Sequence, residues 1–294
     1  MTGRAPSART LAVLGALTIA FSSILVRLAD VSPSTAAIFR CAYALPVLAG
    51  LAAWERRRLG PRSARERWTA AIAGVFFAAD LICWHHAIAD VGAGLATVLG
   101  NLQVAFVPLV AWALLDERPA GRILATLPIV LSGVVLISGV LENGAYGDNP
   151  VGGMVFGLAT GLAYAAFILI LRHGNADMRR PAGPLFDATA SAAVVATVAG
   201  LVIGDADLVP AWPAHAWLLT LALSSQVLGW LLISVSLPRL PAALASLLLT
   251  IQPVGSVILA AILLGESPSP LQLAGVAAVL SGVAVVSRPA RQPA

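Results

Sequence analysis

The residues that could do chemistry in this chain are a few polar side chains inside long apolar runs. Asp80 lies near the middle of the run 69–88, and Arg40 lies within the run 35–54. A charged group in such surroundings needs a partner or a water-filled cavity, so each marks a candidate functional site. Two interpretations stay open. Arg40 and Asp80 form a buried ion pair that only fixes packing, or Asp80 binds a solute or couples a proton.

Two amides stand out for the same reason. Gln103 and Gln252 each lie about ten residues inside an apolar run, 92–115 and 242–264 respectively. Amides at that depth can bind a polar solute, and they can equally supply hydrogen bonds between helices. We predict both as solute-binding residues.

Aromatic side chains accompany these polar groups. Gln226 and Trp230 are four residues apart, as are Asp80 and Trp84, so on regular helices each pair shares a face. An aromatic ring beside an amide or a carboxylate suits an organic solute, although core packing explains such pairs about equally well. We predict Trp84, Gln226 and Trp230 as further solute-binding residues.

Other chemistry finds little support. Cys41 and Cys83 lie inside apolar runs and fit packing roles, and no spacing of Cys, His or acidic residues indicates a metal. No metal-peptidase, serine-hydrolase, phosphate-loop or dinucleotide motif occurs. We therefore expect no catalytic residue, no metal and no cofactor.

The elements that must position these residues are membrane helices. Of the 294 residues, 59% are hydrophobic and 11% are charged, against about 25% charged in a soluble domain. Such a chain has lipid as its solvent, and in lipid every backbone group must be satisfied internally, which favours helices. The predicted spans are 10–29, 35–54, 69–88, 92–115, 122–140, 151–171, 184–204, 214–237, 242–264 and 271–287.

The arginines give the orientation. When the spans alternate in direction, sixteen of the 18 basic residues fall on one side, and only Arg27 and Arg40 fall on the other. This bias predicts a bacterial cytoplasmic membrane protein with both termini in the cytoplasm, and it excludes nucleic acid as the reason for the net charge of +4. The positive-inside rule also explains the cluster from Arg56 to Arg67 better than a lipid- or nucleotide-binding patch does.

The two halves of the chain repeat one another. Residues 95–138 align with 244–287 without a gap, and sixteen of these 44 positions are identical. Five spans per half place the second copy upside down, so we predict an all-α membrane protein of ten helices in two inverted repeats, 10–140 and 151–287. Glu117 and Glu266 match between the repeats, and their position beyond a span predicts the capping of a neighbouring helix end.

The repeat also carries a family resemblance. The segments Leu-Leu-Asp-Glu-Arg-Pro (114–119) and Leu-Leu-Gly-Glu-Ser-Pro (263–268), with Arg40 and the stretch 80–85, resemble the EamA-type permeases of the drug/metabolite transporter superfamily. The resemblance implies a ten-helix secondary transporter that moves a small organic metabolite or amphiphile by alternating access. Efflux is favoured over uptake.

Several partners and alternatives stay open at this point. The expected partners are the solute and the lipid bilayer. A proton or an exchanged solute as the coupling partner, and assembly into a homodimer, are left open. The alternatives are a structural or assembly membrane protein and, less favoured, a membrane-embedded enzyme. For an enzyme, Asp80 and His85 are a poor start because they face different directions on a helix.

Overall fold

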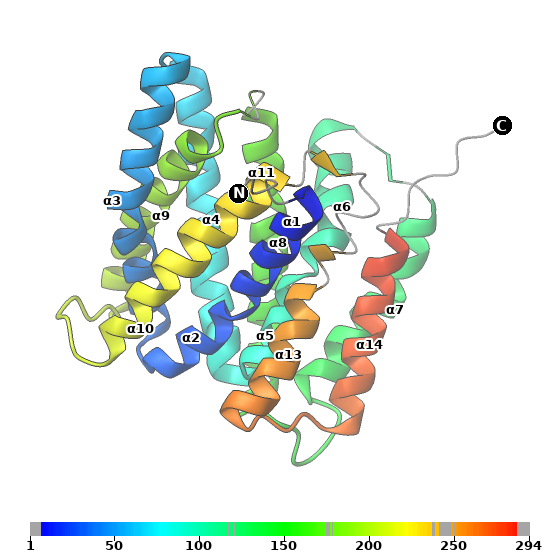
Figure 1. Cartoon of the computed structure of the whole chain (residues 1–294). Coiled ribbons are helices and arrows are strands. Elements are labelled where there is room, and N and C mark those ends of the chain that lie inside the picture. The colour runs from blue at the N-terminus through cyan, green and yellow to red at the C-terminus, as the bar shows by residue number, and fades with distance from the viewer. Residues whose placement is uncertain are drawn as a thin grey trace, which may run out of the picture.

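The computed structural model describes residues 7–116, 118–119, 121–174, 177, 179–236, 239–240, 248–249 and 251–286. Helices make up most of this part and it contains no strand, which confirms the predicted all-α class (Figure 1). The helices are α1 (Ala8–Ala20), α2 (Ser22–Ala29), α3 (Pro33–Leu59), α4 (Ala64–Val91), α5 (Ala93–Gly100), α6 (Gln103–Leu115), α7 (Gly121–Ser138), α8 (Pro150–Gly174), α9 (Ala182–Ile203), α10 (Ala214–Leu221), the π-helix η1 (Ala222–Gly229), α11 (Trp230–Ser236), α13 (Ile251–Leu264) and α14 (Pro270–Val286).

Seven helical stretches of the described chain are long and apolar enough to cross a bilayer. Each coincides with a predicted span, and α1–α2, α5–α6 and α10–η1–α11 each act as one stretch. Three shorter apolar helices, within α7, α13 and α14, match the remaining predicted spans. The multi-pass membrane class is thus confirmed, whereas the count of ten spans remains a prediction. Residues 241–247, with which the ninth predicted span begins, lie outside the described part.

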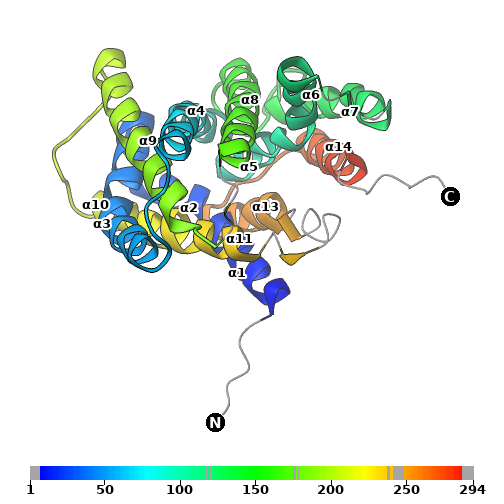
Figure 2. The ribbon, with the colours of Figure 1, turned by 90° about the horizontal axis from the view of Figure 1, so that it is seen from above.

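Helices that correspond in the two repeats pack against each other. The pairs are α3 with α9, α5 with α13 and α7 with α14. In the last pair, a Cβ on Gly133 would lie 2.9 Å from the carbonyl oxygen of Gly275, so the two backbones are in close contact. Seen from above, α3 and α9 lie at one edge of the bundle and α7 and α14 at the other, with α4 and α8 between them (Figure 2).

Buried carboxylates join the ends of these pairs. Glu55 on α3 accepts hydrogen bonds from the backbone N–H groups of Ala182 and Gly183, at 2.8 and 2.7 Å, where α9 begins. At the opposite end, Asp205 follows α9 and accepts from the N–H of Ser34 on α3 at 3.3 Å. Because each acid lies at the C-terminal end of one helix and caps the start of the other, α3 and α9 run antiparallel, as inverted repeats require.

Glu266 makes the same kind of cap for the second pair. It follows α13 and accepts from the N–H groups of Ala93 and Gly94, at 2.6 and 3.1 Å, at the start of α5. This confirms the predicted capping role of Glu266. Its repeat counterpart, Glu117, lies outside the described residues.

The fourth predicted span is kinked between α5 and α6. Here the N–H of Val104 bonds the carbonyl of Asn101 at 3.1 Å, a tighter i→i−3 pattern than an α-helix makes. Pro108 lies further along, inside α6. Proline leaves a carbonyl one turn upstream without its donor, so the distortion falls before the proline rather than at it.

Candidate functional site

A cavity of about 70 Å³ lies among the middle turns of the helices, where the two repeats meet. Its walls come from α1 to α5 of the first repeat and from α8, α11 and α13 of the second. The lining residues are Ile19, Ser22, Arg40, Phe77, Asp80, Leu81, Trp84, Thr97, Gly100, Asn101, Tyr164, Trp230 and Gln252. This is the candidate site.

Asp80 supplies the carboxylate of the cavity. It lies past the midpoint of α4 and is 8% exposed, so it is screened from bulk water. The hydroxyl of Thr160 donates to the backbone carbonyl of Asp80 at 2.8 Å, which ties α8 to α4 beside the carboxyl group. The sequence thus located a buried acid, and the fold puts it at a wall shared by both repeats.

Arg40 supplies the opposite charge, but its partner is not the one considered from the sequence. Within the described residues Arg40 and Asp80 form no ion pair, although both line the cavity. Arg40 instead donates its Nε to Oε1 of Gln226 at 3.0 Å, and its guanidinium carbon lies 5.6 Å from the centre of the Trp84 ring. The amide and the ring contact the guanidinium, which has no ion pair with the carboxylate. Its Nη1 is buried and has no partner among the described residues.

Gln226 lies behind the cavity wall rather than in it. It is fully buried, and its Nε2 donates to Oγ1 of Thr189 on α9 at 3.1 Å while its Oε1 holds Arg40. The prediction assumed an α-helix, whereas residues 222–229 form a π-helix, on which positions four apart still lie close in angle. Gln226 nevertheless has polar partners, while Trp230 packs against aromatic rings, so Gln226 positions Arg40.

Aromatic rings form one wall of the cavity. Trp230 meets Tyr164 with ring centroids 6.1 Å apart and Phe77 at 6.0 Å, both edge to face. On α4, Phe77 precedes Asp80 and Trp84 follows it, and both rings line the cavity. Edge-to-face packing holds these rings in place, which gives a fixed apolar surface beside the two charged groups.

The two predicted amides occupy different positions. Gln252, in the first turn of α13, lines the cavity. Gln103 begins α6 immediately after the kink and is half-buried, but it is not among the lining residues. Asn101, within the kink itself, lines the cavity in its place and donates its Nδ2 to the carbonyl of Thr97 at 2.9 Å.

Sequence reasoning missed several lining residues, of which Tyr164 and Ser22 have the clearest signal. Tyr164 lies near the middle of α8, and Ser22 lies at the junction of α1 and α2. Both are polar groups at mid-depth in an apolar run, which is the criterion that identified Asp80. Phe77 carries no such signal, because an apolar ring in a membrane helix is ordinary.

The described part of the chain holds no group of three or more His, Cys, Asp or Glu side chains that could bind a metal ion. Its charged centre is one carboxylate and one guanidinium on separate walls. Such an arrangement can bind a polar solute, and it offers no nucleophile with an adjacent base.

Comparisons with known proteins fit this architecture. A solved structure described as "Crystal structure of protein" superimposes with a TM-score of 0.62 over 95% of each chain; at 16% identity the likeness concerns the fold alone. A protein of Pseudomonas aeruginosa described as "Uncharacterized protein PA1977" is 32% identical over 293 residues, 97% of this chain and 96% of its own length. A model of the EamA-like transporter family matches residues 7–139 and again residues 151–288. The chain therefore belongs to the EamA-like transporter family.

Proposed function

We propose that this protein is a secondary transporter that binds a small organic solute in the central cavity and releases it on the other side of the membrane. The observation that carries the proposal is that Asp80 and Arg40, two opposite charges, line one aromatic-walled cavity where the two repeats meet. Charged groups held apart inside a membrane protein are costly, and a solute that contacts both offsets that cost.

The chemistry of the walls defines the solute class. Asp80 suits a cationic group such as an ammonium, while the unpartnered Nη1 of Arg40 offers a donor to an acceptor such as a carboxylate. Trp84, Tyr164 and Trp230 suit an apolar or aromatic body. The solute is therefore a metabolite-sized molecule with at least one cationic group.

Alternating access follows from the size of the cavity. A volume of about 70 Å³ holds roughly two water molecules, whereas sites for organic ligands measure about 300 Å³ or more. The helices around the cavity must separate for the solute to enter, and the rocking of one half against the other opens it to each side in turn. In this cycle Asp80 either neutralises the solute's cation or exchanges a proton as the solute leaves. We propose export as the physiological direction.

A thermal-shift screen of the purified protein against a metabolite library tests the proposal. The test variant is Asp80→Asn, which removes the charge with little change in shape. The matched control is Asp30→Asn, because Asp30 is exposed, lies far from the cavity lining and has φ +48°, a conformation that Asn accepts.

A solute that raises the melting temperature of the wild type and of Asp30→Asn, but not that of Asp80→Asn, supports the site. The same solute should then show saturable flux into proteoliposomes, and the direction of a pH gradient that drives it gives the coupling. Binding without any flux would contradict transport and leave only a binding protein. Equal stabilisation of all three proteins would show that Asp80 does not take part in binding.

A further inference from the structure

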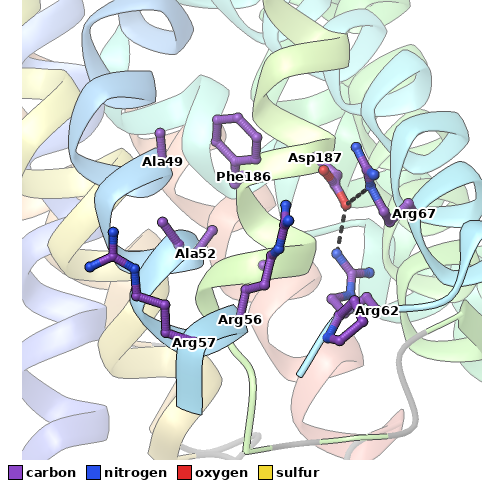
Figure 3. A pocket seen from close by; sticks show the side chains of 11 residues that line it. Ala49, Ala52, Arg56, Arg57, Arg62, Arg67, Phe186 and Asp187 are labelled. Atoms are coloured by element: carbon purple, nitrogen blue, oxygen red, sulfur yellow. Dashed lines mark hydrogen bonds and ion pairs between the residues drawn. The ribbon is translucent and has the colours of Figure 1, made fainter. Parts of the chain in front are cut away.

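A second, larger hollow lies at the arginine-rich end of the bundle, between α3, α9 and the segment that leads into α4 (Figure 3). Its volume is about 550 Å³, and four arginines line it: Arg56, Arg57, Arg62 and Arg67. We propose that this hollow is a binding site for the phosphate headgroup of an anionic phospholipid, which links α3 of the first repeat to α9 of the second.

The charge of the hollow is unbalanced. Asp187 on α9 accepts from Nη1 of Arg62 at 2.6 Å and lies 4.0 Å from Nε of Arg67, so one carboxylate serves both arginines. Figure 3 shows Asp187 between these two side chains, with Arg56 directed into the hollow. Arg56 and Arg57 form no ion pair with a described carboxylate.

Glu55 does not restore the balance. Both of its oxygens already accept backbone N–H groups at the start of α9, where they cap the helix. Even with Glu55 counted, four positive charges face two negative ones. An anion with several acceptor oxygens, such as a phosphodiester, completes this set.

The rest of the hollow is apolar and suits lipid chains. Ala49, Ala52 and Ala53 on α3 leave a shallow channel opposite Phe186 on α9. A neighbouring hollow of about 540 Å³ lies between α4 and α9 and shares Arg67, Phe186 and Asp187 with the first. The arginines thus lie at the ends of two apolar channels. This arrangement matches a phospholipid, in which one charged headgroup carries two acyl chains.

The position along the membrane normal agrees with this ligand. Trp68 lines the neighbouring hollow and Trp54 follows Ala53 on α3, and they are 71% and 54% exposed, as is typical of aromatic residues at the membrane–water interface. The positive-inside rule assigns this end to the cytoplasmic leaflet, where basic pockets between helices meet anionic headgroups. A positive-inside role explains the number of arginines, but it does not explain their convergence on a hollow with apolar channels below it.

The test measures lipid binding and is independent of transport. The full-length protein in a neutral detergent is titrated with dioctanoyl phosphatidylglycerol, with dioctanoyl phosphatidylcholine and with inorganic phosphate, and the melting temperature is followed. We expect saturable stabilisation by phosphatidylglycerol alone. Since one arginine near an anionic lipid contributes about fivefold in affinity, the double variant Arg56→Gln/Arg57→Gln should bind about 25-fold more weakly.

Two further variants distinguish binding in this hollow from a general effect of positive charge. Arg65→Gln removes an arginine of the same end that does not line the hollow, and it should bind like the wild type. Ala52→Trp fills the channel and leaves every charge, so it should weaken phosphatidylglycerol binding although the protein folds. Equal stabilisation by inorganic phosphate would identify a soluble anion as the ligand and overturn the lipid assignment. Unchanged binding by the double variant and by Ala52→Trp would overturn the site.

Discussion

At the scale of single residues, the candidate site depends on a short chain of hydrogen bonds behind its wall. Thr189 on α9 holds Gln226, and Gln226 in turn holds Arg40. All three side chains are buried, so no water can replace a lost partner cheaply. The orientation of the guanidinium in the cavity is therefore set by an amide that no solute touches.

Replacing Gln226 with Leu keeps the side-chain volume and removes both bonds. The unfolding free energy should fall by about 2 kcal/mol, because a buried charged donor loses its acceptor. Ligand stabilisation should weaken as well, since Arg40 is free to turn. Thermal unfolding with and without the solute measures both effects. Ser132→Ala is the control, as this exposed serine bonds only its own helix. Full ligand stabilisation in Gln226→Leu would contradict the positioning role.

The sequence could identify the residues with chemistry but not all of their contacts. Asp80 and Arg40 were recognisable because a charge inside an apolar run is conspicuous whatever the fold. The Arg40–Gln226 hydrogen bond joins residues 186 positions apart, so no local sequence pattern predicts it. The π-helix is equally hidden, because the stretch 222–229 has a composition that an ordinary α-helix accepts.

At the scale of elements, helix order and approximate limits followed from hydropathy alone. Lipid removes most alternatives to a helix, and turns rich in Pro and Gly mark the ends of each span. The kink between α5 and α6 lies upstream of Pro108 because proline acts on a hydrogen bond one turn away from itself. The caps were partly foreseeable, since the position of Glu266 in the repeat indicated a structural role, whereas Glu55 gave no such signal.

The cap of α5 makes a prediction about pH. Burial raises the pKa of the Glu266 carboxyl above its ordinary value of 4.5, while the N–H groups of Ala93 and Gly94 act in the opposite direction. The folded protein therefore holds this proton to higher pH than the unfolded chain does. As pH rises from about 4.5 through the folded-state pKa, the unfolding free energy of the wild type should fall relative to that of Glu266→Gln.

Thermal unfolding of the two proteins in detergent between pH 4 and pH 8 measures this difference. Glu266→Ala should be less stable at every pH, by about 1 kcal/mol, because it loses both acceptors of the cap. Asp116→Asn is the control, since Asp116 is exposed and has φ +59°, which Asn tolerates. A difference that does not vary with pH would show that Glu266 keeps one protonation state throughout.

At the scale of the whole molecule, the cavity should open to one side at a time. Gln252 lines the cavity from the second repeat, so a cysteine there reports its access to water. In a chain with Cys41→Ala and Cys83→Ala, we expect Gln252→Cys to react with a charged thiol reagent from one side of the membrane. Bound solute should slow the reaction severalfold.

A cysteine at Val202 is the control for that measurement. Val202 is 82% exposed on α9, away from the cavity, so solute should leave its reactivity unchanged. Absence of labelling at position 252 from both sides, with and without solute, would contradict a water-accessible pathway and favour a purely structural protein.

The reciprocal caps between α3 and α9 also bear on how such a chain could have arisen. Glu55 needs the start of α9, and Ser34 needs Asp205, so neither half satisfies its own helix ends. An ancestor that consisted of a single repeat with this packing would have needed a second copy inserted in the opposite orientation to supply the missing partners. Duplication and fusion would then have made a dual-topology dimer permanent, and freed each copy to diverge.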